Sequence, residues 1–508
     1  MSVNKLIKGT FIFASAGLIC RIMGFVFRIF LSRIMSPSEI GLCNMVMPIC
    51  ILGQSIAAGG LTTAVSKYTA AYMTQHKKDK GYINFLATLL YCTIAGCICS
   101  VVIAANSGLV AHMVIKNDTC RTFLIIAAYS IPFGCLHTVI SSYFIGLELH
   151  HLPAISQILE QVVRIISVYI FSRICVQNNT PVTGIIALYG ILAGEISSSA
   201  FSLLAVIFLN DKYKNEPTGL IRTPIYYFAE GIMQLAANFK LGMPISLNRI
   251  CAHIIQSLEA FILPMSLVTF GLSNEDALAT YGIITGMTLP LLLFPATLTN
   301  SMSQALLPDI SKAWERKDTK ELYKSINLSV NIATSLGFIC ITGFYYYGSH
   351  FGEFIFKNPA VSEQIKYLCI LCPFIFVLAP VSSILNAIGK SGMVLITNLI
   401  SQTIRLFIIV FFIPHVGING FFAALIISHA LSCIILLISL KKITGCTYSL
   451  KKLIVAPAFK CIICFFATFP IYSLLSKYTT LPEIITIIIG GASFGISSLY
   501  FSYIYQRS

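Results

Sequence analysis

Residues 418–440 read INGFFAALIISHALSCIILLISL, an unbroken apolar run without Asp, Glu, Lys or Arg. An α-helix of about 20 such residues crosses the hydrocarbon core of a bilayer. Its apolar residues do not alternate with polar ones at every second position, as they do in a strand of a membrane barrel. This stretch therefore predicts a transmembrane helix.

Most of the chain has the same character. Of its 508 residues, 56% are apolar and only 10% are charged, and the mean hydropathy is +0.84. Soluble globular proteins carry about 25% charged residues, so this composition excludes a soluble protein. Polar clusters, Pro and Gly divide the sequence into 14 predicted spans. They lie at 10–32, 42–70, 83–106, 122–146, 153–173, 184–209, 240–266, 279–306, 325–347, 366–388, 392–414, 418–440, 454–475 and 483–504.

The basic residues indicate which loops are cytoplasmic. The net charge is +15, from 34 Lys and Arg against 19 Asp and Glu. With a cytoplasmic N-terminus, 21 of the cations between the spans fall inside and 7 outside, as the positive-inside rule requires. The charge excess is therefore explained by orientation in the cell membrane, without a nucleic-acid partner, and both termini are predicted to be cytoplasmic.

A shift of 241 residues superposes polar residues of the two halves, which are rare in apolar helices. The superposed pairs are Gly41 with Gly282, Ser141 with Ser382, Ser142 with Ser383, Gln157 with Asn398, Gln161 with Gln402, and Arg164 with Arg405. One constant offset indicates a duplication, and six crossings between the halves make the repeat parallel. We predict two pseudosymmetric six-helix lobes at 1–210 and 232–440, a cytoplasmic connection at 211–231, and two added helices in 441–508.

Charged side chains inside the predicted spans are the functional signal, because a charge at the bilayer centre costs a few kcal/mol. The cations are Arg21, Arg28, Lys67, Arg164, Arg249 and Arg405, and the acids are Glu160, Glu195 and Glu259. A surplus of cations predicts a cavity that binds an anion, and the planar guanidinium suits the oxygens of a phosphate. We therefore predict that these six cations bind substrate.

Several of these residues have a plainer interpretation as well. Glu160 and Arg164, four residues apart, also fit a structural pair on one helix. Arg28 also fits a side chain that reaches the outer interface, and His253 fits packing. A gating or coupling role is predicted for the three acids and for His253, Pro48 and Pro290, because the prolines are expected to interrupt the second and eighth spans.

No pattern predicts catalysis or a metal site. The C-x-x-C pairs Cys369/Cys372 and Cys461/Cys464 lie in apolar runs without His or carboxylates nearby, which is typical of packing residues. The sequence contains no P-loop pattern G-x-x-x-x-G-K-[ST] and no H-E-x-x-H pattern. We therefore predict a transporter without a cofactor, driven by a proton or sodium gradient, by the membrane potential or by the gradient of its substrate.

Five stretches resemble a known family. They are GFVFRIFLSRI (24–34) with IGL (40–42) and Pro48, GLTTAVSK (60–67), YFIGL (143–147), AISQ with EQVVR (154–164), and Tyr281-Gly282 through LPDIS (281–311). In them the chain resembles the polysaccharide-transporter branch of the multidrug/oligosaccharidyl-lipid/polysaccharide superfamily, and the resemblance runs over nearly the whole chain. It implies 14 helices in two lobes, a central cavity open alternately to each side, and flipping of undecaprenyl-linked sugars for spore cortex peptidoglycan.

The resemblance also implies that Arg21 and Arg28 hold the pyrophosphate of the substrate. Cys43 and Asn44 depart from the family, which has an aromatic residue or Gln there. We predict a flippase whose partners are a polyprenyl-pyrophosphate-linked sugar, membrane lipid and cell-wall synthases.

Two alternatives stay open. A cation-coupled multidrug antiporter of the same fold would need a carboxylate-rich cavity, and the surplus of cations argues against it. A membrane-embedded glycosyl polymerase or ligase would need sizeable outer loops, whereas those near 107–121 and 348–365 are short.

Overall fold

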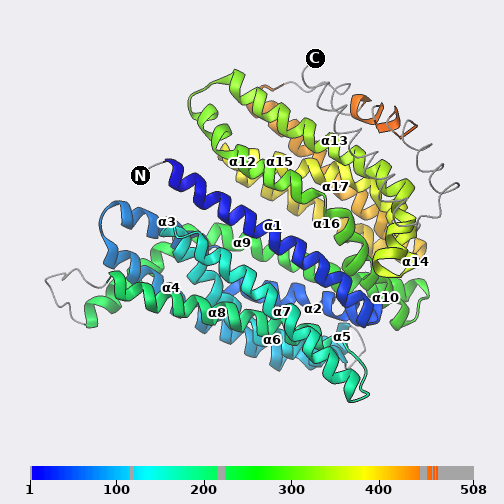
Figure 1. Ribbon diagram of the computed structural model, residues 1–508, viewed down its shortest axis with the longest axis horizontal. Coiled ribbons are helices and arrows are strands. Elements are labelled where there is room, and N and C mark those ends of the chain that lie inside the picture. The colour runs from blue at the N-terminus through cyan, green and yellow to red at the C-terminus, as the bar shows by residue number, and fades with distance from the viewer. Residues whose placement is uncertain are drawn as a thin grey trace, which may run out of the picture. The chain divides into compact units, whose positions relative to one another are not determined.

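The computed structural model describes residues 3–114, 119–213, 224–446, 455–459, 461–463 and 465–466, and the regular structure in these ranges is helical (Figure 1). In this part of the chain, twelve helical segments are long and apolar enough to cross a membrane. The chain is therefore a multi-pass helical membrane protein. The predicted span 483–504 and more than half of the span 454–475 lie outside the described residues, so the count of 14 stays a prediction.

The helices follow most of the predicted spans. Those of the first half are α1 (Val3–Ile34), α2 (Pro37–Ala57), α3 (Leu61–Thr74), α4 (Lys78–Ala105), α5 (Ser107–Val114), α6 (Thr119–Gly146), α7 (His151–Gln177) and α8 (Ile185–Tyr213). Those of the second half are α9 (Pro224–Phe270), α10 (Asn274–Ile283), the π-helix η1 (Ile284–Thr288), α11 (Leu289–Leu293), α12 (Ala296–Glu315), α13 (Thr319–Phe351), the π-helix η2 (Gly352–Phe356), α14 (Pro359–Leu368), the 3₁₀-helix η3 (Cys369–Leu371), α15 (Cys372–Ala387), α16 (Ser391–Val416) and α17 (Ile418–Thr444).

Local signals set several helix ends. The side chain of Asp318 accepts the backbone N–H groups of Lys320 and Glu321 at 3.1 and 3.0 Å, which caps the start of α13. Such caps satisfy N–H groups that have no partner within the helix. Gly445, at φ 74°, ends α17 in the left-handed conformation that favours glycine.

The prediction that Pro48 interrupts the second span is wrong. α2 runs through Pro48 and ends at Ala57, and the interruption lies at residues 58–60, before α3. One proline removes a single backbone hydrogen bond of the helix, and the bonds around it persist. The break occurs instead where a Cβ on Gly60 would lie 2.8 Å from Ile245 Cβ of α9, which is too close for any other residue.

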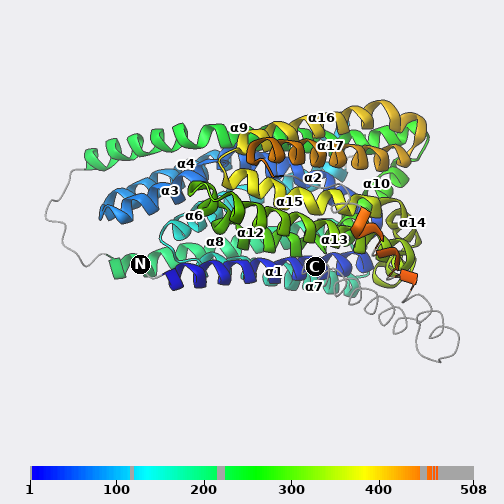
Figure 2. The ribbon, with the colours of Figure 1, turned by 90° about the horizontal axis from the view of Figure 1, so that it is seen from above.

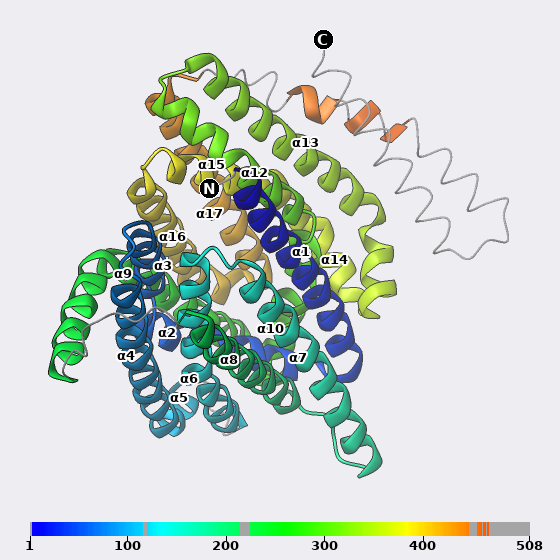
Figure 3. The same cartoon turned by 60° about the vertical axis from the view of Figure 1, so that its left-hand side comes forward.

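By packing, the chain divides into two units. The first comprises Met1–Met265 and Asn274–Gly282, and the second comprises Ser266–Ser273 and Ile283–Ser508. In the first unit α8 packs against both α6 and α7, and α1 packs along α7 (Figure 3). In the second unit α15 packs against α12, α13 and α17. These units are defined by contacts between helices and not by which helices arose from the duplication. The predicted lobe boundaries therefore stay predictions.

The helix boundaries recur at the spacing of the predicted repeat. Thr319, where α13 begins, stands 241 residues after Lys78, where α4 begins. Glu315, where α12 ends, stands 241 residues after Thr74, where α3 ends. These coincidences of length and order support a duplication of the helical pattern.

Two glycines paired by that offset lie against each other in the first unit. A Cβ on Gly282 would stand 2.7 Å from Gly41 N, and a Cβ on Gly41 would stand 3.3 Å from Gly282 N. Only glycine allows α2 and α10 to approach so closely. Equivalent residues that touch each other lie at the axis relating two copies, so this contact also supports the repeat.

A row of polar side chains, which we name the α9 ladder, holds α9 on α3 and α4 (Figure 2). It consists of Glu230, Gln234 and Asn238, which are four residues apart and so share one face of α9. All three side chains are buried. The ladder explains why most of α9 belongs to the first unit, although the predicted second lobe begins at residue 232.

Each rung of the α9 ladder has a partner on a neighbouring helix. Lys80 Nζ lies 2.9 Å from Glu230 Oε1. Tyr72 donates its hydroxyl hydrogen to Gln234 Oε1 at 2.7 Å, and Asn238 donates to Thr88 Oγ1 at 2.7 Å and to Asn84.

Removal of one partner of the Lys80–Glu230 pair should destabilise the protein. The carboxylate of Glu230 is buried whereas Lys80 is partly exposed, so Lys80→Ala is expected to lower the free energy of unfolding by about 1–3 kcal/mol. The double variant Lys80→Ala/Glu230→Gln should be more stable than the sum of the single variants predicts, because no buried charge then lacks its partner. Thermal unfolding of purified variants measures both effects. If the loss of stability in the double variant equals the sum of the losses in the two single variants, the ion pair does not stabilise the protein.

Candidate functional site

The apolar helix α1 carries two exposed arginines. Arg21 and Arg28 are seven residues apart, about two turns, and so lie on one side of the helix. Phe27 is buried, and Phe30 packs its ring against Tyr169 of α7 at a centroid distance of 6.4 Å. Aromatic packing therefore holds α1 against α7.

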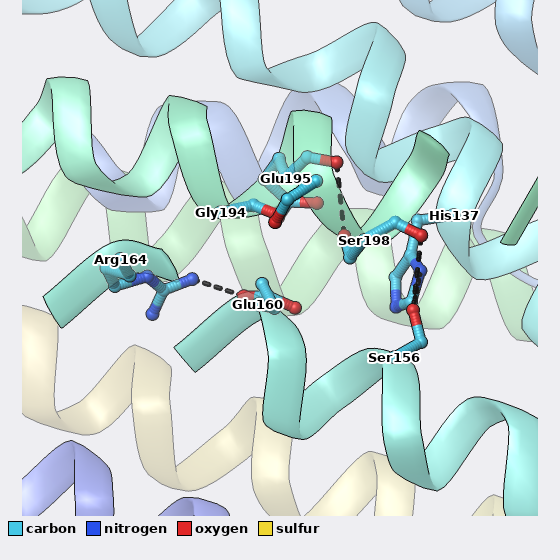
Figure 4. Close-up of polar contacts among 8 residues, drawn as sticks. His137, Ser156, Glu160, Arg164, Gly194, Glu195 and Ser198 are labelled. Carbon is cyan, nitrogen blue, oxygen red and sulfur yellow. Dashed lines mark hydrogen bonds and ion pairs between the residues drawn. The ribbon is translucent and has the colours of Figure 1, made fainter. Parts of the chain in front are cut away.

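A polar cluster lies where α7 meets α8. Arg164 and Glu160 form an ion pair on α7, which is the structural pair that their spacing allows (Figure 4). The pair fits closely on α8, because a Cβ on Gly194 would stand 2.9 Å from Glu160 O. Arg164 Nε is buried and has no hydrogen-bond partner among the described residues.

The cations of α1 and α7 share one electrostatic environment. Arg28 lies close enough to Arg164 for the two positive charges to repel each other. Cys20, one residue before Arg21, lies within electrostatic reach of both Glu160 and Arg164. The structure thus brings together Arg28, Arg164 and Glu160, three of the predicted site residues, and places Arg21 on the same helix as Arg28.

Glu195 of α8 extends this cluster toward α6 (Figure 4). A Cβ on Gly134 of α6 would stand 3.4 Å from Glu195 Oε2 and 3.0 Å from Gln54 Cδ of α2. The absence of a side chain at Gly134 therefore makes room for a carboxylate and an amide from two other helices. Glu195 Oε2 is buried, and no described residue donates a hydrogen bond to it.

Arg249 has a structural partner at the break between α2 and α3. Its guanidinium donates a hydrogen bond to Gly59 O at 3.0 Å, and Ser246 Oγ accepts the N–H of Gly60 at 2.8 Å. Carbonyl groups at the end of a helix need such donors, and a positive charge is favourable there. This contact supports a structural role for Arg249, while its predicted contact with substrate stays a prediction.

The other predicted residues of α3 and α9 lie in separate places. Lys67 is exposed on α3. His253 Nδ1 lies 3.0 Å from Gln256 Oε1 on its own helix, and Glu259 is half buried one turn further along. These contacts leave the predicted coupling roles of His253 and Glu259 as predictions.

The eighth predicted span is interrupted at residues 294–295, directly before α12, and not at Pro290, where the helical segment Asn274–Leu293 continues. Pro290 stands in the first turn of α11, directly after the π-helix η1, and Pro295 caps α12. Thr288, at the end of η1, donates its hydroxyl hydrogen to Gln364 Oε1 at 2.7 Å. The boundary between the two packing units falls between Gly282 and Ile283, in front of this interruption, so the predicted gating role of Pro290 stays open.

Arg405 lies half buried on α16 of the second unit. The residue four positions earlier is Ser401, which accepts a hydrogen bond from Ser432 at 2.6 Å. The second unit therefore has a serine where the first unit has Glu160. Gln402 Oε1 and its offset partner Gln161 Oε1 are both buried without a hydrogen-bond partner among the described residues.

The described part of the chain contains no group of three or more His, Cys, Asp or Glu residues that could hold a metal ion. Cys369 and Cys372 are buried in the second unit, and Cys464 lies outside the described residues.

Sequence reasoning missed two polar groups. One is the α9 ladder, whose residues lie before or at the edge of the span predicted at 240–266. The other surrounds His137 of α6, which stands in an apolar run of the sequence. A period of four in Glu230, Gln234 and Asn238 could have indicated the ladder, whereas no sequence pattern connects His137 with its partners on α7 and α8.

Comparisons of the sequence with known proteins found one family and two relatives. The family described as "Polysaccharide biosynthesis protein" matches residues 6–314. "Stage V sporulation protein B" of Bacillus subtilis (strain 168) is 25% identical over 461 residues, 89% of this chain and 86% of that protein. "Sporulation protein YkvU" of the same organism is 19% identical over 374 residues, 73% of this chain and 79% of that protein.

Solved structures share the fold. The structure titled "Lipid II flippase MurJ, inward closed conformation" matches with a TM-score of 0.69 and 15% identity, over 97% of this chain and 98% of that chain. An inward-facing "multidrug resistance MATE family transporter of the MOP superfamily" matches with a TM-score of 0.64 and 15% identity, over 84% and 98% of the two chains. Identities this low show a common fold only.

Proposed function

Since the chain belongs to the polysaccharide biosynthesis protein family, we propose that it is a transporter, not an enzyme, and moves a lipid-linked oligosaccharide across the cell membrane. A relative is named for sporulation, and a protein of the same fold is named a lipid II flippase. The proposed substrate is an undecaprenyl-pyrophosphate-linked precursor of spore cortex peptidoglycan. Cell-wall synthases would use the translocated sugar, and both termini would be cytoplasmic.

The exposed arginine pair of α1 carries this proposal. An exposed charge inside an apolar span is costly unless water or a charged ligand meets it. Arg21 and Arg28 lie about 10 Å apart along the helix axis and share one side, so an elongated polyanion can contact both. Two guanidinium groups can replace the water around a pyrophosphate with paired hydrogen bonds.

The acidic residues near these arginines supply a means of coupling. Glu160 and Glu195 lie in one cluster within the first unit, and Glu195 Oε2 is buried without a hydrogen-bond donor among the described residues. A proton gradient could therefore drive transport through this cluster, without a cofactor; a sodium gradient or the membrane potential is an alternative driving force. The two exposed cations argue against a cationic drug as the substrate.

Reconstitution tests the function directly. Purified protein in lipid vesicles should move fluorescent lipid II between leaflets, and a membrane-impermeant quencher added outside measures the fraction that has crossed. Vesicles without protein and vesicles with Arg21→Ala are the controls. If wild-type vesicles equilibrate lipid II no faster than empty ones, with or without an imposed pH gradient, the proposed function is wrong.

A further inference from the structure

His137 of α6 sits in a buried hydroxyl pocket that no proposed step yet uses. The imidazole is 6% exposed, and its Nδ1 lies 3.2 Å from Ser156 Oγ of α7 and 3.3 Å from Ser202 Oγ of α8. The two hydroxyl oxygens are 3.1 Å apart, and Ser156 Oγ also lies 3.2 Å from Ser198 O (Figure 4). We call these four residues the His137 site.

The His137 site can hydrogen-bond Nδ1 of both the neutral and the protonated imidazole. A serine hydroxyl donates or accepts, depending on its rotation. With neutral His137, a hydroxyl donates to Nδ1. With protonated His137, Nδ1–H donates to a serine oxygen, and the hydroxyl hydrogen of Ser156 turns to Ser198 O. Nδ1 therefore has a hydrogen-bond partner in both protonation states. A histidine with a purely structural role needs a partner in one state only.

The His137 site borders the acidic cluster. Gly134, which faces Glu195 Oε2, is one turn before His137 on α6. Ser156 is one turn before Glu160 on α7, and Ser198 is one turn after Glu195 on α8, where it donates its hydroxyl hydrogen to Glu195 O at 3.1 Å. Three neighbouring helices thus place the imidazole one turn from both carboxyl groups (Figure 4).

Few other charges face this site. α6 packs against α2, α3, α4, α5, α7 and α8. The charged residues of α2 and α4 stand in their first turns, and α5 has only His112. The described charged residues in the remainder of these helices are Lys67, Glu160, Arg164, Arg173 and Glu195, with Asp211 and Lys212 in the last turn of α8. Lys67 is exposed and Arg173 bonds Tyr169, which leaves Glu160, Arg164 and Glu195 as the charged residues within about two helical turns of the residues of this site.

We propose that His137 is a second proton-carrying residue, which exchanges one proton with the carboxyl group of Glu195 during transport. The proton leaves a carboxyl oxygen of Glu195 and binds a ring nitrogen of His137, through a hydroxyl group or one water molecule. The products are a carboxylate and an imidazolium, so the total charge of the buried cluster does not change. This inference rests on the proposed function, because it supplies the route for the coupling proton.

The second unit provides a matched control. Nδ1 of His429 in α17 lies 2.8 Å from Leu425 O. A carbonyl oxygen can only accept, so Nδ1 must carry the hydrogen, and the ring cannot switch its role at that atom. His429 is half buried, and its Nδ1 has a fixed carbonyl acceptor and only one serine hydroxyl nearby, Ser428 Oγ of its own helix at 3.5 Å.

Proton uptake by the purified full-length protein tests the site without any transport. Acidification from pH 8 to pH 4 should bind fewer protons per chain in His137→Gln than in the wild type, because the variant lacks one of the two proton-binding side chains, His137 and Glu195. His429→Gln removes a histidine of the second unit and is the control for the loss of an imidazole as such. Equal uptake by His137→Gln and the wild type would overturn the proposal. If His137→Gln does not yield folded protein, the double variant Ser156→Ala/Ser202→Ala provides the test. Proton uptake by this variant that equals wild-type uptake would also overturn the proposal.

Transport by the same variants tests the coupling. In vesicles, His137→Gln should lower lipid II movement driven by a pH gradient by about tenfold or more, and keep gradient-free equilibration near the wild-type rate. Gradient-driven movement at the wild-type rate would refute the role of His137. Absence of all movement in the wild type refutes the proposed function instead, and the proton count then still decides whether His137 carries a proton.

Discussion

Arg21→Ala is expected to abolish lipid II translocation and to leave the amount of protein in the membrane nearly unchanged. Arg21 is exposed on α1, so its removal opens no cavity in the packed part of the first unit. A cation that meets a pyrophosphate in a water-poor site contributes far more than one at a surface, and truncating such a partner costs about 2–5 kcal/mol. The initial rate of translocation should therefore fall by about 100-fold.

Arg21→Lys should restore part of the rate. Lysine returns the positive charge but not the planar fork that binds two oxygens at once. Arg33→Ala is the matched control, because Arg33 is exposed in the last turn of the same helix and lies at its predicted outer end. Full activity in Arg21→Ala, at normal abundance, would remove the pyrophosphate role from this residue.

The helices of this protein could be predicted from sequence because each depends on local composition. A run such as 418–440 must be helical in a bilayer, since every backbone polar group needs a partner within the segment. The end of α2 could not be predicted in this way. It depends on Gly60 and on the α9 residues that touch it, about 185 positions later in the sequence. Pro48 is a strong local indication of a helix break, but α2 continues through it.

In the candidate site, too, contacts within one helix could be predicted from sequence and contacts between helices could not. The pair Glu160 and Arg164 was visible in the sequence, because both residues stand on one helix at a known spacing. The place of Glu195 beside Gly134 and Gln54 depends on the crossing of three helices. His137 gains its significance from two serines on other helices, and a histidine without such partners, such as His429, has the same appearance in the sequence.

Arg164→Ala is expected to lower both the amount of protein in the membrane and its activity. The ion pair with Glu160 is largely buried, and Gly194 packs against the backbone of Glu160, so the carboxylate cannot turn toward water without disturbing the contact between α7 and α8. Loss of one partner leaves a buried charge, which costs about 3 kcal/mol.

The double variant Glu160→Gln/Arg164→Ala removes that charge and should recover the abundance of the wild type, as measured by immunoblotting of membranes. Arg405→Ala is the matched control in the second unit. The residue of α16 that stands 241 positions after Glu160 is Ser401, which bonds Ser432. Arg405→Ala therefore removes a cation that has no carboxylate four residues before it on the same helix. Abundance should therefore fall much less in Arg405→Ala than in Arg164→Ala. If the double variant is as poorly expressed as Arg164→Ala, the loss comes from the packing of the arginine itself, and the ion pair is not what stabilises the contact of α7 with α8.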